Sequence, residues 1–221
     1  MNCDCSWDVS VPTDCSTIEA ALNGASDLEV DYDMTDEECN EPDRELHLVR
    51  DSVINVEAGE HVLSAVFPRS GSNYNTRVTI SGAGAETTLI SPDGAYNRIL
   101  ELVDHSDADP HFRNMTNWYD STAGKWRGTN IEGVTFAEAD LCNGTDDPYN
   151  DCPATKAGHG GAVYVDDGGV RFNEVAFCNN RADYGGAVYL DYTGHSDDYG
   201  PGRVRFRNTR FEANVAGFDG G

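Results

Sequence analysis

Two pairs of adjacent aspartates stand in turn-rich segments in the second half of the chain. Asp166-Asp167 precedes Gly168-Gly169, and Asp197-Asp198 precedes Tyr199-Gly200. Carboxylate oxygens are the ligands that calcium prefers, so both pairs are candidate metal ligands, and calcium is the only cofactor that the sequence suggests. Aspartate is also common in solvated turns, where its side chain bonds to the local backbone. Both interpretations remain open at this point.

A second group of candidate binding residues consists of aromatic side chains in polar segments. They are Trp118, Tyr119, Trp126, Tyr192 and Tyr199. Exposed Trp and Tyr rings can stack on sugar rings or anchor a protein partner. The alternative is that these loops pack their own aromatic rings onto the scaffold.

The charge of the chain excludes some partners. Its 221 residues include 39 acidic and 15 basic ones, a formal net charge of −24. Such a field repels nucleic acid and anionic membranes, so neither is an expected partner. It suits divalent cations, basic partners or high salt. No run approaches the roughly 20 apolar residues that span a bilayer.

The seven cysteines indicate an exported protein, extracellular or at the cell surface. No C-x-x-C pair suggests a zinc site, so disulfides are the better interpretation. Cys142 and Cys152 flank a turn-rich loop and are the best candidate bridge. Cys178 is either bridged to that loop or a free surface thiol. The first residues, MNCDCSWDVS, do not resemble a signal peptide.

The chain divides into a cysteine-rich N-terminal cap, residues 1–45, and a strand-rich region, residues 46–221. In the cap, Ser16–Glu19 followed by AALNGA predicts a short N-capped helix that ends at Asn23-Gly24. From residue 46 onward, brief β-branched and aliphatic runs alternate with Gly, Asn and Asp. The sequence therefore predicts an all-β protein with a short helix-containing cap.

An internal repeat organises the last third of the chain. GGAVYV at 160–165 matches GGAVYL at 185–190, VRF at 170–172 matches VRF at 204–206, and FCNN at 177–180 matches FEAN at 211–214. The residues expected to hold this repeat together are Gly160, Gly161, Phe177, Asn180, Gly185, Gly186, Phe211 and Asn214. A further copy begins at Gly220-Gly221, so the chain ends within a repeat.

Stacking is the way such a repeat can form a core. Alternate residues of each short strand point to one side, and stacked copies bury that side in a parallel sheet. The glycine pairs allow a tight corner. Asn180 and Asn214 follow the ends of strands, where their amides can stack and satisfy buried backbone groups.

The GGAVY and F-x-x-N motifs resemble repeats of chlamydial polymorphic outer-membrane proteins and related bacterial β-helical adhesins. The runs at 54–61 and 78–84 are similar to the opening coils of pectin-lyase-like proteins. The resemblance implies a right-handed parallel β-helix solenoid with an extracellular role. It does not by itself imply catalysis, because this fold also forms inert stalks.

Gly158-His159-Gly160 resembles the Gly-His-Gly signature of polygalacturonase-type β-helix hydrolases. That likeness implies His159, Asp166 and Asp167 as catalytic candidates, with paired carboxylates as acid and base. The Asn-Thr-Asp and Arg-x-Lys runs of those enzymes are missing, and Gly160 already belongs to the repeat. A structural corner is therefore the favoured interpretation of this motif.

The leading functional hypothesis is a non-enzymatic secreted or cell-surface adhesin or structural module. Its partners would be a surface glycan, a host protein or further copies of itself, joined head-to-tail into a homopolymer through an open C-terminal coil. The alternative is a polysaccharide lyase or glycoside hydrolase that acts on acidic polysaccharide, which calcium would bridge to this acidic chain.

Overall fold

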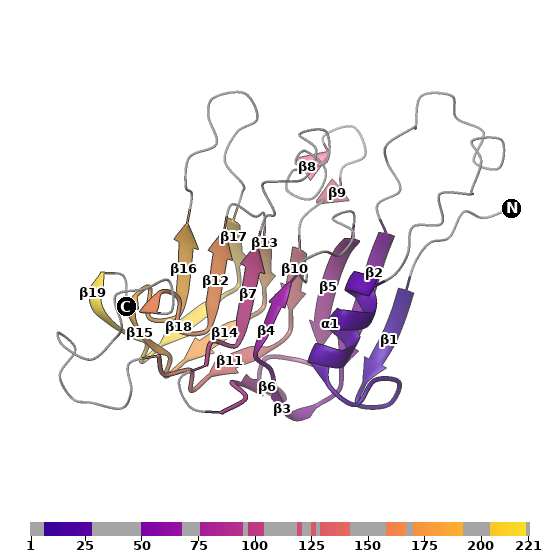
Figure 1. Cartoon of the computed structure of the whole chain (residues 1–221), viewed down its shortest axis with the longest axis horizontal. Coiled ribbons are helices and arrows are strands. Elements are labelled where there is room, and N and C mark those ends of the chain that lie inside the picture. Colours follow the sequence, from indigo (N-terminus) through magenta and orange to yellow (C-terminus); the bar gives the residue numbers. More distant parts are fainter. Residues whose placement is uncertain are drawn as a thin grey trace, which may run out of the picture.

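The protein is mostly strand, arranged in parallel sheets with little helix. The computed structural model describes residues 7–27, 50–67, 76–94, 97–103, 119–120, 125–126, 129–141, 158–166, 170–191 and 204–219. The prediction of an all-β chain with a short helix near its N-terminus is confirmed. Figure 1 shows the strands side by side along the long axis of the molecule, with α1 near the N-terminal end.

One helix and nineteen strands make up the described structure. In chain order they are β1 (Trp7–Val11), α1 (Ile18–Asp27), β2 (Arg50–Val56), β3 (Gly59–Val62), β4 (Ala65–Phe67), β5 (Thr76–Gly82), β6 (Thr88–Ser91), β7 (Leu100–Val103), β8 (Tyr119–Asp120), β9 (Lys125–Trp126), β10 (Thr129–Glu132), β11 (Thr135–Ala137), β12 (Val163–Asp166), β13 (Val170–Asn173), β14 (Ala176–Cys178), β15 (Arg181–Tyr184), β16 (Val188–Asp191), β17 (Val204–Arg207), β18 (Arg210–Glu212) and β19 (Val215–Asp219).

Three parallel sheets receive successive strands of the chain in turn. The six-stranded sheet has the order β1-β2-β5-β10-β13-β17, the five-stranded sheet β18-β14-β11-β6-β3, and the four-stranded sheet β16-β12-β7-β4. Thus β2, β3 and β4 enter the three sheets in sequence, and β5, β6 and β7 follow beside them. The smaller pairs are parallel β15-β19 and antiparallel β8-β9.

The strand register matches the predicted repeat alignment. Tyr164 lies opposite Tyr189, Phe172 opposite Phe206, and Phe177 opposite Phe211. Residues that align in the sequence are therefore neighbours in adjacent strands. This arrangement places like residues in continuous columns that run through the sheets.

One hydrophobic core receives side chains from all three sheets and from α1. In the six-stranded sheet one column of that core runs, in register, through Val9, Ile54, Ile80, Ile131 and Phe172. The column changes from branched aliphatic side chains to phenylalanine toward the C-terminal strands. Strands β6 and β13 bury alternate residues, which is the period-2 pattern predicted from the sequence.

The helix α1 begins as predicted but is longer than predicted. Thr17 Oγ1 accepts a hydrogen bond from the backbone N–H of Ala20 at 3.1 Å, which is the N-capping geometry expected at this position. The helix continues past Asn23-Gly24 to Asp27. A single glycine inside a helix costs only about 1 kcal/mol relative to alanine. The buried stripe of Ile18, Ala21 and Leu22 holds the preceding turns on the core.

The N-terminal segment also adds a strand to the main sheet. In β1, Val9 lies opposite Ile54 and Val11 opposite Val56 of β2. The sequence of residues 1–45 predicts a cap with a helix but not this strand pairing. β1 therefore belongs to the same sheet as strands that follow residue 46.

Left-handed backbone corners recur at matching places in successive repeats. Glu138, Asn179 and Ala213 follow β11, β14 and β18 with φ angles of 66°, 55° and 53°. Few residues other than glycine adopt this region. Its recurrence in register shows that the corners are set by the architecture rather than by the local residue type.

Candidate functional site

The glycine pairs form the corners beside the four-stranded sheet, and His159 lies in one of them. Gly160 has φ of +65° and Gly185 has φ of +57°, and a Cβ at either would lie 2.3 Å from the carbonyl oxygen of Val163 or Val188. Both the conformation and the space therefore require glycine. The second glycine of each corner is needed for close approach between strands, because a Cβ on Gly161 would lie 2.0 Å from Gly186 O.

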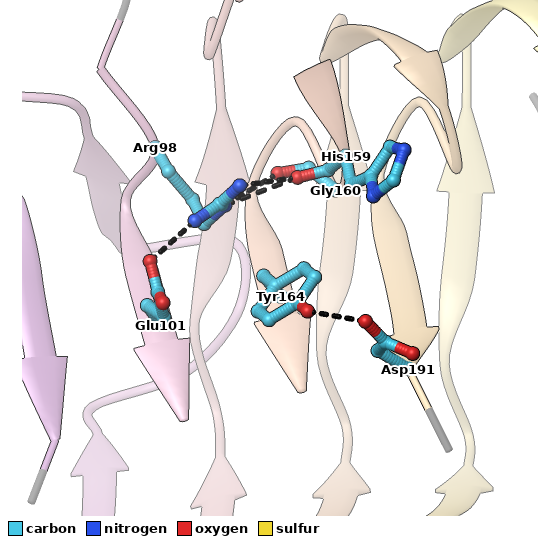
Figure 2. A network of polar contacts seen from close by, with 6 residues as sticks. All are labelled: Arg98, Glu101, His159, Gly160, Tyr164 and Asp191. Carbon is cyan, nitrogen blue, oxygen red and sulfur yellow. Dashed lines mark hydrogen bonds and ion pairs between the residues drawn. The ribbon is translucent and has the colours of Figure 1, made fainter. Parts of the chain in front are cut away.

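Arg98, just before β7, holds the first corner from outside. Its Nε donates to the carbonyl oxygens of His159 and Gly160, each over 3.1 Å, and its Nη2 donates to His159 O over 2.5 Å. Its Nη1 pairs with Glu101 Oε2 at 2.5 Å (Figure 2). Burial lowers the pKa of the Arg98 guanidinium, and the neighbouring Glu101 opposes that shift. Arg98 thus satisfies backbone carbonyl groups of the tight corner.

Tyr164 joins this arginine to the next repeat. The Arg98 guanidinium carbon lies 4.8 Å from the centre of the Tyr164 ring, a cation–π contact. The Tyr164 hydroxyl donates to Asp191 Oδ2 over 2.6 Å (Figure 2). Val163 and Val165 on either side belong to the hydrophobic core. Since neighbouring residues of a strand point to opposite faces, Tyr164 lies on the outer face, yet it is fully buried.

His159 is packed between aromatic rings. Its imidazole stacks on Tyr189 with centroids 4.3 Å apart and meets Tyr184 edge-on at 4.9 Å. Tyr189 is also parallel to Tyr164 at 5.9 Å. These contacts place the histidine in a stack that runs along neighbouring repeats.

Asp183 is a buried carboxyl next to His159. It is 3% exposed, and its Oδ1 has no hydrogen-bond partner. Burial raises the pKa of Asp183, and His159 opposes that rise. A desolvated carboxyl of this kind is unfavourable when it is ionised.

An asparagine pair joins the corners that follow the five-stranded sheet. Asn180 Nδ2 donates to Phe136 O over 3.1 Å and to Asn214 Oδ1 over 2.9 Å, and Asn180 Oδ1 accepts from Ala139 N over 3.2 Å. Asn214 Nδ2 donates to Phe177 O over 2.8 Å. Each amide therefore satisfies the backbone of the preceding repeat, as the stacking argument predicts.

Phenylalanine rings stack beside the asparagines. The centroids of Phe136 and Phe177 are 5.5 Å apart, those of Phe177 and Phe211 5.0 Å, and those of Phe172 and Phe206 5.1 Å. Stacked rings at these separations add to the stability that burial alone provides.

The described residues contain only part of the predicted site. Outside them lie the candidates Asp167, Asp197, Asp198, Cys142, Cys152, Trp118, Tyr192 and Tyr199. Asp166 is the last residue of β12, opposite Val103 and Asp191. Tyr119 and Trp126 lie opposite each other in the β8-β9 pair. Among the described residues, no group of three or more His, Cys, Asp or Glu could hold a metal ion.

Cys178 is a free, half-buried thiol. It lies on β14 opposite Glu212, as the repeat alignment predicts. The sequence left open a bridge from Cys178 to the loop between Cys142 and Cys152 or a free thiol, and the structure has the free thiol. Cys15 is also free, and it packs against the core.

The residues that the sequence analysis missed act across long separations. Arg98 reaches His159, which is 61 positions away, and no local pattern marks it. The Tyr164–Asp191 bond could have been predicted, because Tyr164 lies in one aligned GGAVY copy and Asp191 directly follows the next copy, GGAVYL at 185–190. Asp183 resembles an ordinary solvated turn residue in the sequence, and its burial is set by tertiary packing.

The described site can brace neighbouring repeats against one another. Arg98, Tyr164 and Asp191 bind one another or the backbone of a corner.

No family model, curated protein or solved structure matches this chain. None of the helical structure described is long and apolar enough to cross a membrane.

Proposed function

We propose that the three parallel sheets are the faces of a right-handed parallel β-helix, and that the protein is a non-enzymatic structural or adhesin module, secreted or at the cell surface. The cyclic order in which strands enter the sheets supports the helix. Its right hand follows from the strong preference of parallel crossover connections for that hand. The module would display its intervening loops to a surface glycan, a protein or another copy of itself.

One observation carries this proposal: buried polar side chains bond neighbouring repeats to one another. Asn180 bonds backbone and side-chain groups on both sides of its own repeat. Arg98 binds the carbonyl groups of the corner that contains His159. Networks of this kind give a scaffold a single rigid register. His159 contributes a packed ring to this scaffold.

The remaining candidates lie in or beside the segments that join the repeats in the sequence. Calcium held by Asp166, Asp167, Asp197 and Asp198, a bridge between Cys142 and Cys152, and contacts by Trp118, Tyr119, Trp126, Tyr192 and Tyr199 remain part of the proposal. A net charge of −24 favours cations and basic partners at such loops.

Hydrolysis or lyase cleavage of an acidic polysaccharide is the competing function. The raised pKa of Asp183 beside His159 is the one observation in its favour, because a general acid needs a carboxyl that stays protonated. The burial of Asp183 and the stacking of His159 between two tyrosines argue for a structural role.

The deciding experiment measures turnover. The purified chain is incubated with polygalacturonate and with a neutral polysaccharide, with and without calcium, while reducing ends and unsaturated-product absorbance are followed. We expect no product under any condition. Turnover that disappears in His159→Ala and Asp183→Asn, with both variants still folded, would establish the enzyme and reject the scaffold.

A further inference from the structure

Polar side chains cluster on the outer face of the six-stranded sheet, at β13 and β17. Phe172 of β13 is buried in the core, so its neighbours Arg171 and Asn173 lie on the outer face. Arg205 and Arg207 lie directly opposite these two residues on β17. Four adjacent outer positions therefore hold three arginines and one amide, and we call them the arginine patch.

The arginine patch contrasts with the charge of the chain. Only 15 of the 221 residues are basic and 39 are acidic, yet three arginines meet at neighbouring positions. Like charges that face each other directly across two strands are unfavourable, and Arg171 faces Arg205 in the register of the sheet. An anion held between the two guanidinium groups would remove that repulsion.

The carboxylate in register with the arginine patch is engaged by other partners. Glu132 of β10 lies opposite Asn173 on the outer face. Its Oε1 accepts a hydrogen bond from Ser81 Oγ over 3.2 Å, and its Oε2 accepts from Asn130 Nδ2 over 3.3 Å. Glu132 is therefore held by a serine and an asparagine rather than by the arginines.

Another arginine of the same molecule shows how a neutralised guanidinium is arranged. Arg210 of β18, on the five-stranded sheet, has Nη2 3.5 Å from Glu86 Oε1 and Nε 3.6 Å from Glu212 Oε2. Among the described residues, neither Arg171 nor Arg207 forms an ion pair. The chain thus supplies carboxylates to Arg210 but not to these two arginines.

The arginine patch faces outward from the sheet rather than along its edge. Strands β10 and β17 flank β13 on both sides (Figure 1), and Arg171 is nevertheless only half-buried. Arg205 and Arg207 are exposed. A strand paired beside β17 would lie in the plane of the sheet, so binding to the outer face does not depend on a free β17 edge. The three guanidinium groups lie on one side of the sheet, where a single ligand can contact them.

The spacing of the arginines favours a tetrahedral oxoanion. Neighbouring strands are about 4.8 Å apart, and each guanidinium presents a planar fork of N–H donors. A carboxylate has two oxygens, which a single fork occupies. A sulfate ester has three free oxygens, so it can accept from the forks of Arg171 and Arg205 together. The amide of Asn173 adds a neutral donor beside them for a sugar hydroxyl.

The net charge of −24 discriminates among the polymers that contain such groups. Duplex nucleic acid has one charge per about 1.7 Å of its axis, so a long stretch of it is repelled. Sulfate groups on an otherwise neutral sugar backbone can stand further apart, and charges beyond about 8 Å are screened at physiological ionic strength. An isolated sulfate can therefore bind the arginines without opposing the whole field of the protein.

We infer that the arginine patch binds a sulfated polysaccharide, with one sulfate ester between Arg171 and Arg205 and with Arg207 on a neighbouring group of the same polymer. The inference rests on the proposed display function and names the chemistry of the glycan. It places the contact on the sheet itself rather than on the segments that join the repeats.

Fluorescence anisotropy of a labelled dextran oligosaccharide with isolated sulfate groups tests the inference in the full chain. We expect Arg171→Gln and Arg207→Gln each to weaken binding about tenfold, equivalent to about 1.4 kcal/mol. Arg171→Lys retains a point charge without the bidentate geometry and should fall between these variants and the wild type. Arg210→Gln makes the same change of charge on the other sheet and is the matched control, which should bind as the wild type does.

Competition separates sulfate from other anions. The unlabelled sulfated oligosaccharide should displace the probe, whereas unsulfated dextran and polygalacturonate should not. Polyglutamate or a nucleic-acid duplex that displaces the probe equally well overturns the inference in favour of an acidic protein or a nucleic acid. Equal weakening by Arg210→Gln also overturns it, because binding would then reflect charge alone.

Failure of the inference and failure of the proposed function are distinguishable. A folded wild type that does not bind the probe overturns the inference and leaves the scaffold proposal standing, whereas polysaccharide turnover rejects the scaffold function independently. Circular dichroism checks the fold of every variant. Arg207→Gln, at an exposed position of β17, provides the measurement if Arg171→Gln loses its fold.

Discussion

The side-chain amide of Asn180 donates to Asn214 Oδ1 over 2.9 Å, and Asn214 donates in turn to Phe177 O over 2.8 Å. The two residues are 34 positions apart and occupy the same place in successive repeats. Asn180 is fully buried, whereas Asn214 is partly exposed at the last repeat. Asparagine at this position of the repeat is therefore buried in one copy and partly exposed in the next. Its contribution to stability can thus be compared between the two copies within one molecule.

We expect Asn180→Ala to lower the free energy of unfolding by about 3 kcal/mol, because it leaves Ala139 N and Phe136 O buried without their partner. Asn214→Ala should cost about 1 kcal/mol, since water can replace its amide at the exposed end. Urea unfolding followed by circular dichroism measures both. Asn173→Ala, outside this network, is the control, and equal losses at Asn180 and Asn214 would contradict the buried ladder.

The alignment of the sequence predicts this part of the fold because its residues act on their own copies. A repeat that stacks on itself brings Phe177 to Phe211 and Asn180 to Asn214 whatever the loops between them do. The corner interpretation of Gly160 follows in the same way from its match with Gly185. The repeat in the sequence is therefore sufficient to predict these contacts.

Contacts between unlike residues could not be predicted in this way. Arg98 belongs to no repeated motif, and its corner lies 61 positions away. The strand β1 has no repeat partner in the sequence, so its pairing with β2 depended on tertiary packing of the N-terminal segment. The helix end was predicted at Asn23-Gly24, but the helix continues to Asp27, because one glycine inside a helix costs only about 1 kcal/mol.

Corner glycines should tolerate alanine only where space allows it. Gly94→Ala is expected to cost about 1 kcal/mol, because φ is +86° but the nearest atom to an added Cβ is 3.5 Å away. Gly185→Ala should cost about 3 kcal/mol or more, since strain is joined by a 2.3 Å approach to Val188 O. Thermal unfolding of the two variants gives the comparison. Similar losses would mean that backbone strain alone sets the requirement for glycine.

Removing the guanidinium of Arg98 should destabilise the corner around His159. Arg98→Met removes the hydrogen bonds that Arg98 donates to the carbonyls of His159 and Gly160 and its ion pair with Glu101, and we expect a loss of about 3 kcal/mol. Arg98→Lys keeps the charge but loses the planar fork, so an intermediate loss follows. Glu101→Gln is the matched control for the ion pair. If Arg98→Met and Glu101→Gln lose equally little in urea unfolding, the corner does not depend on the arginine.

The buried carboxyl of Asp183 gives stability a pH dependence of defined sign. Burial raises the pKa of Asp183 in the folded chain, with His159 opposing the rise, whereas the unfolded chain titrates near the ordinary value of about 3.9. The protonated carboxyl therefore contributes stability that is fully present below that value and is lost as the pH rises through the raised folded pKa. Asp183→Asn should remove this loss and raise the unfolding free energy at pH 7 by about 1 kcal/mol.

Urea unfolding of the wild type and of Asp183→Asn measures this difference in the free energy of unfolding. The measurement is repeated between pH 4 and pH 8 in steps of about one pH unit. The two curves should converge toward acid and separate as the pH rises. Glu138→Gln, an exposed carboxylate at a corner, is the control and should follow the wild type. A variant that is less stable than wild type at neutral pH would show that ionised Asp183 is favourable, through its contact with His159, and that the buried carboxyl belongs to a charged pair rather than to a desolvated acid.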